Sequence, residues 1–296
     1  MCGRFTSTST LEALVAVFGV DEVRAEPQLA RYNVAPGQQV LAVAVSHGHE
    51  EGKGPRRQLG TLRWGLVPSW AKDPSVGNRM INARAEGIAA KPAYRAALVR
   101  RRCLIPADAF YEWQVPPGRD GPRGPKVPHA IRRRDGAPMA LGGLWELWRD
   151  RGDPDAPPLR TCVVVTTAAN ELLAPIHDRM PVVLDPGSWE RWLDPATGPD
   201  GALDLLRPAP SGWFETFALS SAVNRVGNDG PDLLTPLAAG AGPDSSAASA
   251  SPSRPSEPSS ASASTGGSAV QVVSAGEGLG DGRGYTRAVQ AELGQD

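Results

Sequence analysis

The residues best suited to carry out a reaction are the first four of the chain, Met1-Cys2-Gly3-Arg4. Removal of Met1 before a small residue leaves Cys2 with a free α-amino group beside its thiol, a combination called a 1,2-aminothiol. The two groups have ordinary pKa values of about 8 and about 8.5, so both are partly nucleophilic near neutral pH. The thiolate can attack an acyl carbon with the amine as its base, or amine and thiol together can capture an aldehyde as a Schiff base that closes to a thiazolidine ring. A Cys2 that is incidental at a frayed terminus is the third interpretation.

Two further polar residues stand in apolar surroundings and are candidates to act with Cys2. Glu112 lies between aromatic residues in the strand-like run FYEW. Facing outward it is an ordinary surface residue, whereas facing inward its burial raises the carboxyl pKa and makes it a general acid or base. His177, in IHDRMP, is the one histidine in an apolar setting, and it is either a structural or a functional histidine. Cys103 and Cys162 lie in apolar strand contexts, where we expect buried core thiols.

The composition excludes several classes of protein. The chain has 296 residues with 31 Lys and Arg against 32 Asp and Glu, a net charge of −1, which excludes a uniformly basic nucleic-acid coat but not a local basic cleft. Three cysteines make no disulfide scaffold and indicate a reducing compartment, so we expect a cytoplasmic protein. We expect no membrane contact, because no apolar run approaches the ~18 residues of a span and no secretion signal opens the chain. The sequence has no CxxC and no HExxH motif, so we expect no metal and no cofactor.

Arginine and tryptophan residues are the candidates for contacts with a nucleic acid. The runs Arg100–Arg102 and Arg132–Arg134 are usually solvated faces, although such runs also line phosphate tracks. A tryptophan beside a proline, such as Trp70 two residues after Pro68, can stack on bases or wedge between them when it is exposed. Core packing is the usual role of the eight tryptophans.

By composition the chain divides into a body, residues 1–236, and a tail, residues 237–296. From residue 241 to 268 the tail is Ala, Gly, Pro and Ser with almost no apolar bulk, so it cannot offset the entropy of ordering and is expected to be disordered. A short helix is expected near residues 285–293. The tail holds six acidic and three basic residues, so the body carries a net charge of +2.

The body is expected to contain both helices and strands. Apolar residues in 11–18 recur at the spacing of one buried helix face, with Ser9 and Glu12 as a capping box and Gly19 as the stop. A second helix is expected from Pro92 to Arg101, and the stretch Val115–Pro128 is expected to be a surface loop. The expected strands are Gln39–Ser46, Cys103–Ile105, Met139–Leu141 and Thr161–Thr167. Because helices and strands do not alternate regularly, we predict an α+β fold with mostly antiparallel strands.

The order of the motifs is more specific than any one of them. The runs MCGRF, RYNVAPGQ, WGLVPSWAKD, INARAE, KPAYRAALVRRRCLIPADAFYEW, LGGLWE, IHDRMPVVL and AVNRVGND strongly resemble the SRAP family, the SOS-response-associated peptidases now viewed as abasic-site processing proteins. The resemblance covers residues 1–236, and the tail lies outside it. It implies a domain of twisted, mostly antiparallel sheets with a barrel-like core flanked by helices.

The family resemblance also implies a function in DNA repair and the response to DNA damage. Members bind single-stranded DNA with an abasic site and link their N-terminal cysteine to the ring-opened sugar aldehyde as a thiazolidine, which shields the lesion. The implied protein acts as a monomer, associates with the nucleoid when DNA-bound, and has a lyase-type cross-linking activity. The peptidase label implies protease or hydrolase activity toward its own Met1, although a separate aminopeptidase serves equally well.

Carried onto this sequence, the resemblance assigns roles to individual residues. Cys2 is the nucleophile through both amine and thiol, Asn82 orients the amine or the sugar, Glu112 shuttles protons, and His177 holds the opened sugar and protonates leaving oxygens. The residues expected to contact DNA are Arg84 and Arg179 as phosphate clamps, Arg4 as a weaker candidate, and Pro36 and Trp70 as apolar groups that interrupt base stacking.

Two other functions remain open from the residues alone. A class II glutamine amidotransferase also begins with a processed Met-Cys-Gly, but its oxyanion hole is often an Asn-Gly pair, and no Asn-Gly dipeptide occurs in this chain. A non-catalytic single-strand DNA-binding module would use the Trp and Arg residues and leave Cys2 without a role.

Overall fold

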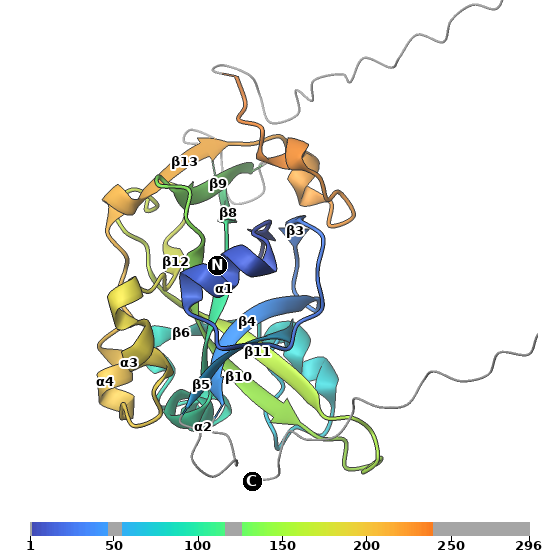
Figure 1. Cartoon of the computed structure of the whole chain (residues 1–296). Coiled ribbons are helices and arrows are strands. Elements are labelled where there is room, and N and C mark those ends of the chain that lie inside the picture. Colours follow the sequence, from blue (N-terminus) through green and yellow to red (C-terminus); the bar gives the residue numbers. More distant parts are fainter. Residues whose placement is uncertain (1, 47–54, 116–125, 239–296) are drawn as a thin grey trace, which may run out of the picture. The chain divides into compact units, whose positions relative to one another are not determined.

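The computed structural model describes residues 2–46, 55–115 and 126–238. Two sheets dominate this part of the chain (Figure 1). The five-stranded sheet has the order β13 (Phe214–Ala218), β9 (Val127–Arg133), β8 (Ala109–Gln114), β1 (Phe5–Ser7) and β3 (Arg31–Val34). The eight-stranded sheet has the order β12 (Arg179–Pro181), β11 (Leu159–Ala168), β10 (Met139–Trp148), β7 (Arg102–Ala107), β4 (Gln39–Ser46), β5 (Arg56–Trp64) and β2 (Glu22–Val23), with β6 (Asn82–Arg84) paired to β11. The predicted α+β class with mostly antiparallel strands is confirmed.

A parallel contact between β5 and β11 closes part of the larger sheet into a barrel. The hydrogen-bonded path runs from β11 through β10, β7, β4 and β5, and the pairs Thr161↔Arg63 and Cys162↔Trp64 return it to β11. β6 also runs parallel to β11, with Asn82 opposite Val164. Closure leaves the strands in this circuit without a free edge, and it fixes Asn82 at the rim of the barrel.

Alternation along the barrel strands separates two apolar clusters. On β11, Cys162 and Val164 belong to a cluster that continues onto the inner face of the five-stranded sheet, through Phe5 and Phe110. The intervening Val163 packs into the other cluster, beneath the helices. Because side chains of a strand alternate between faces, a strand buried on both faces carries a continuous apolar run, as residues 162–165 do. The buried Thr161 before this run accepts a hydrogen bond from the Val67 N–H. Cys103 and Cys162 are both fully buried, as predicted.

The helices cover the outer face of the barrel. They are α1 (Leu11–Phe18), α2 (Pro92–Arg100), α3 (Trp189–Leu193) and α4 (Pro199–Leu203). Helix α1 buries Leu14 and Phe18 and ends at Gly19, whose φ of 59° is the left-handed conformation that glycine favours. The expected capping box is wrong in detail: Thr10 caps the helix by accepting from the Ala13 N–H, and the Ser9 hydroxyl instead bonds Asp108.

Three further expectations need correction or lie outside the described residues. The arginine run 100–102 is not wholly solvated, because Arg102 is 3% exposed and donates to carbonyls at the ends of α2 and α3. The expected loop 115–128 already ends at Val127, where β9 begins; its residues 116–125 lie outside the described part. The expected disorder and short helix of the tail fall beyond residue 238 and are likewise not described.

A close crossing of two glycines places the segment that leads to Asn82. Gly65 has a φ of 131°, and a Cβ there would lie 2.7 Å from the Gly77 carbonyl oxygen. Beside this crossing the Leu66 N–H donates to Met80 O at 3.1 Å, and the Trp64 indole donates to Ile81 O at 2.9 Å. The absence of both side chains therefore lets residues 77–82 lie against the end of β5.

We predict that Gly65→Ala lowers the free energy of unfolding by about 3 kcal/mol, since the substitution adds both left-handed strain and a backbone clash. Urea denaturation measures the loss. Gly60→Ala on the same strand is the control, because a Cβ there meets nothing within 4 Å. Equal stabilities of the two variants would contradict this account of the crossing.

Candidate active site

Cys2 lies between the inner face of the five-stranded sheet and the barrel. It is fully buried in the apolar cluster that contains Phe5 and Trp64, whose ring centroids are 5.1 Å apart. Its thiol lies 3.9 Å from the Arg4 carbonyl oxygen. The strand β1 that follows Cys2 pairs with β8, with Phe5 opposite Phe110. The position of Cys2 is therefore fixed by a central strand of the sheet, which argues against an incidental residue at a frayed terminus.

Asn82 holds the backbone of Cys2 from the barrel side. Its Nδ2 donates to the Cys2 carbonyl oxygen at 2.8 Å. This bond fixes the orientation of the amide, so Oδ1 is the remaining acceptor. Oδ1 is buried and has no hydrogen-bond partner among the described residues. A buried acceptor of this kind is costly unless a ligand satisfies it.

Glu112 faces inward on β8 and is 1% exposed. Its burial raises the pKa of the carboxyl from the ordinary value to about 7. Burial also raises the pKa of the Cys2 thiol well above its usual range, and the nearby charge of Glu112 raises it further. Of the two conformations that the sequence left open for Glu112, the structure has the buried one, where the carboxyl exchanges protons near neutral pH.

His177 approaches Glu112 from the turn that precedes β12. Its Nε2 lies 4.0 Å from Glu112 Oε2. Its Nδ1 accepts from the Arg179 backbone N–H at 2.9 Å, so the neutral ring carries its proton on Nε2, toward Glu112. Nδ1 also lies 2.8 Å from Asp178 Oδ1, a contact that becomes a hydrogen bond when the ring is protonated. Burial lowers the pKa of His177 and favours the neutral form.

Arg179 is engaged within the protein rather than displayed on its surface. NH1 and NH2 donate to the two carboxylate oxygens of Glu86 at 2.6 and 2.9 Å, and NH2 also donates to Thr166 O at 2.7 Å. The side chain of Arg179 is 12% exposed, against 56% for Glu86. Since β6 and β12 pair on either side of β11, this ion pair ties the segment after Asn82 to the segment after His177.

The other residues expected to contact DNA differ in accessibility. Trp70 is 57% exposed and Arg84 is exposed. Pro36 is half-buried in a turn where the Gly37 N–H donates to Trp64 O at 2.7 Å. Arg4 points into the protein: its NH1 donates to Asn33 Oδ1 at 2.8 Å and to Val223 O at 3.0 Å. Arg4 therefore anchors the segment around Val223, a role that its position beside Cys2 did not reveal.

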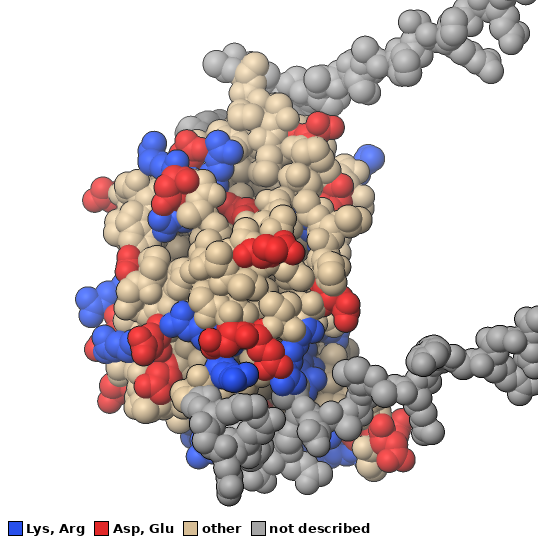
Figure 2. All heavy atoms as spheres, in the orientation of Figure 1, with Lys and Arg blue, Asp and Glu red and all other residues tan. Residues whose placement is uncertain are grey.

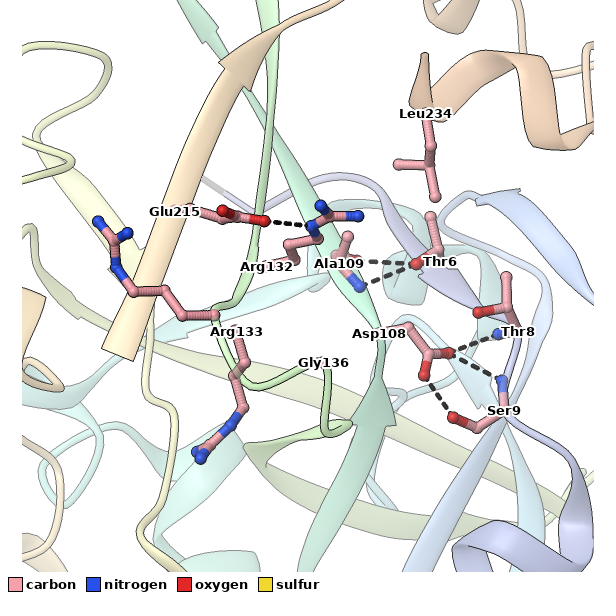
Figure 3. A pocket seen from close by; sticks show the side chains of 11 residues that line it. Thr6, Thr8, Ser9, Asp108, Ala109, Arg132, Arg133, Gly136, Glu215 and Leu234 are labelled. Carbon is pink, nitrogen blue, oxygen red and sulfur yellow. Dashed lines mark hydrogen bonds and ion pairs between the residues drawn. The ribbon is translucent and has the colours of Figure 1, made fainter. Parts of the chain in front are cut away.

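Surface charge is mixed rather than concentrated. Figure 2 shows acidic and basic side chains interspersed on the visible face. A hollow of about 490 Å³ is lined by Thr6, Ala109 and Arg132, among others (Figure 3). These three residues alternate along their strands with the inward-facing ones, so the hollow lies on the face of the five-stranded sheet that points away from Cys2. In that hollow Arg132 is paired with Glu215 at 2.6 Å. It brings together none of the residues expected to do chemistry.

Within the described ranges, no group of three or more His, Cys, Asp or Glu side chains is arranged to hold a metal ion. The same residues include no helix with the length and apolar character needed to cross a membrane.

Cys2 is thus buried and held by Asn82, with Glu112 and His177 near it, where the five-stranded sheet meets the barrel. The family model described as SOS response associated peptidase (SRAP) matches residues 1–226, and the chain belongs to this family. Abasic site processing protein YoqW of Bacillus subtilis is 42% identical over 236 residues, which span 79% of this chain and 99% of that protein.

Other relatives agree with this assignment. Abasic site processing protein YedK of Escherichia coli is 30% identical over 80% of this chain and its full length, and HMCES of Gallus gallus is 32% identical over 71% of this chain and 67% of that protein. A crystal structure from Bacteroides thetaiotaomicron is similar with a TM-score of 0.67 at 20% identity, over 80% of this chain and 100% of that one. This last likeness supports the fold alone.

We predict that Glu112→Gln stabilises the protein above neutral pH. The folded carboxyl has a raised pKa of about 7, so the folded state binds more protons than the unfolded state between about pH 4.5 and 7, and stability falls as pH rises through that window. The variant should gain about 3 kcal/mol at pH 8 and nothing at pH 4. Urea denaturation at both pH values measures it; a gain that is equal at pH 4 and 8 would contradict the raised pKa.

Proposed function

We propose that this protein captures abasic sites in single-stranded DNA by forming a thiazolidine between Cys2 and the ring-opened sugar aldehyde. The observation that carries the proposal is the burial of Glu112 beside Cys2, which gives a carboxyl that exchanges protons near neutral pH. The relatives' names, abasic site processing proteins, supply the substrate class. An abasic site has a sugar aldehyde but no base, so a protein cannot recognise it through contacts to a base edge. Covalent capture of the aldehyde, together with contacts to the DNA backbone, is a suitable mode of recognition.

The first step is hydrolysis of the Met1–Cys2 peptide bond, which frees the α-amine of Cys2. The amine then attacks the sugar aldehyde carbon to give a carbinolamine, and loss of one water gives a Schiff base. Glu112 and His177 are placed 4.0 Å apart, so the protonated carboxyl or the His177 Nε2–H can donate a proton to the departing oxygen. The Asn82 amide, fixed on the Cys2 carbonyl, orients the amine, and its buried Oδ1 accepts from the amine or a sugar hydroxyl.

The third step closes the ring. Because burial and the Glu112 charge keep the thiol protonated, the amine is the first nucleophile and the thiol the second. Glu112, now ionised, takes the thiol proton as sulfur attacks the imine carbon, and the ring nitrogen receives a proton as the C=N electron pair moves onto it. The condensation of Cys2 with the aldehyde releases one water, which balances the water consumed in hydrolysis of the Met1–Cys2 bond, and no oxidant is consumed.

Contacts to the DNA backbone come from the exposed groups around this site. We propose Arg84 as a phosphate contact and Trp70, with Pro36, as the apolar groups that interrupt stacking beside the lesion. Arg179 contributes a phosphate contact if DNA displaces Glu86 from its guanidinium, and Arg4 contributes through the position of Cys2.

The function is tested by mixing the processed protein with single-stranded DNA treated with uracil glycosylase and resolving the products on a denaturing gel. Wild-type protein should give a DNA–protein band that survives heating, and Cys2→Ala none. Cys2→Ser and Cys2→Ala both keep the amine but lack the thiol, so each should give an adduct only after borohydride reduction. Equal behaviour of wild type and Cys2→Ala, or a heat-stable adduct in Cys2→Ser, would overturn the assigned chemistry.

We predict that Glu112→Gln slows cross-linking by about 100-fold, the typical contribution of general acid–base catalysis, with little change in DNA affinity. Single-turnover gels at saturating DNA give the rate, and fluorescence anisotropy gives the affinity. Loss of binding with an intact rate would reverse the assignment.

We predict that Arg84→Ala weakens binding of intact and abasic single strands alike and reduces the log–log salt slope by about 0.7, as expected for one lost phosphate contact. Arg207→Ala, which removes the same charge from the exposed segment after α4, is the control and should leave the slope unchanged. Equal slopes for the two variants would remove Arg84 from the interface.

A further inference from the structure

Beside Glu112, on the inner face of the five-stranded sheet, lies a polar pair with no role in the chemistry described so far. Register places Glu112 opposite His129 of β9, and Gln114 is two residues further along β8. Since alternate residues of a strand share a face, Glu112, Gln114 and His129 lie on the same face. His129 Nε2 lies 3.2 Å from Gln114 Oε1, a diagonal contact across the two strands.

Gln114 also reaches the turn that carries His177. Its Nε2 donates to the Pro175 carbonyl oxygen at 3.1 Å, two residues before His177. An amide that donates from nitrogen must accept at oxygen, so His129 Nε2 carries a hydrogen toward Gln114. The contacts form a short chain from His129 through Gln114 to the Pro175 carbonyl.

The other end of this turn is attached elsewhere. Asn170 Nδ2 donates to Ala209 O at 2.8 Å, and the His177 N–H donates to Leu173 O at 2.9 Å. These bonds give the turn its shape but do not connect it to β8. The bond from Gln114 does, and it starts two residues from Glu112.

We propose that Gln114, oriented by His129, is a positioning residue that sets the separation of Glu112 and His177 by holding the Pro175 carbonyl. This inference rests on the proposed function. At 4.0 Å the carboxylate and the imidazole are too far apart to bond each other directly and close enough to serve one oxygen between them. A displacement of about 1 Å in such a site can cost 100-fold in rate.

Two substitutions at Gln114 separate a positioning role from a general structural one. Gln114→Met has a similar size but no hydrogen bond, so the turn is released, and the cross-linking rate at saturating DNA should fall about tenfold with DNA affinity unchanged. Gln114→Lys keeps a donor for the Pro175 carbonyl and loses the acceptor for His129, and it should retain at least half of the wild-type rate. Gln58→Met, which removes a glutamine bonded to Glu22 on the barrel, is the control and should match wild type.

The pH–rate profile supplies a readout that loss of stability would not move. The titratable groups around Glu112 are the α-amino group, the Cys2 thiol, His129, His177, Asp178 and Lys126. Gln114→Met alters none of them, whereas Gln114→Lys adds a cation beside them, so the profile is compared between wild type and Gln114→Met. Release of the turn admits water to Glu112, so the apparent pKa in Gln114→Met should fall by about one unit from its wild-type value. An unchanged value in this variant would contradict release of the turn.

The outcomes distinguish this inference from the proposed function. If wild type forms no covalent adduct, the proposed function fails whatever Gln114 does. If wild type cross-links and Gln114→Met has the same rate and pH profile, the positioning role alone is overturned. A Gln114→Lys variant as slow as Gln114→Met would also overturn it, because the bond to Pro175 would then not be what matters.

Discussion

A carboxyl group removed from water is the constraint on which the site depends. Glu112 stands on a strand whose inner face packs against a barrel, and the neighbours on that face, Phe110 and Ile131, are apolar and fully buried. Burial of an ionisable group disfavours its charged form, so the fold gives up stability at neutral pH to hold this one. The same burial keeps the neighbouring Cys2 thiol protonated. A proton acceptor and a latent nucleophile are thereby placed together.

The rest of the architecture fixes what surrounds that carboxyl. Barrel closure by the β5–β11 pair brings β6 beside β11, and so brings Asn82 to the carbonyl of Cys2. The Glu86–Arg179 ion pair spans β11 and joins the segments that carry Asn82 and His177. Each proposed chemical group therefore comes from a different strand or turn, and the contacts between these elements determine their spacing. For an aldehyde substrate without a base, this spacing matters more than overall charge, which is small.

The sequence predicted the class of fold, the first helix and its Gly19 stop, the whole of β4 and parts of β7, β10 and β11, because these depend on local periodicity and turn chemistry. The nine-residue β5 is not among the predicted strands. The sequence also singled out Cys2 from its position directly after Met1, and Glu112 and His177 from their apolar settings. It could not predict that Arg4 and Arg102 turn inward, because an arginine beside a cysteine or within an Arg-Arg-Arg run has no local mark of burial. Their partners, such as the Val223 and Trp192 carbonyls, are distant in sequence. Asn82, Arg84 and Glu86 follow one another at a spacing of two, which is typical of residues on one face of a strand. The ion pair of Glu86 with Arg179 could not be predicted in this way, because it depends on β11 lying between the segments that carry these two residues.

The central claim is that Cys2 reacts through both its amine and its thiol, and counting thiols tests it most directly. The chain has three cysteines, and Cys103 and Cys162 are buried thiols with no role in the chemistry. The purified cross-link is denatured, the DNA is digested, and free thiols are titrated with a chromogenic disulfide. A thiazolidine consumes the Cys2 thiol and leaves two per chain, which is the result that we predict. Three free thiols per cross-linked chain would mean a bond through the amine alone and would contradict the account.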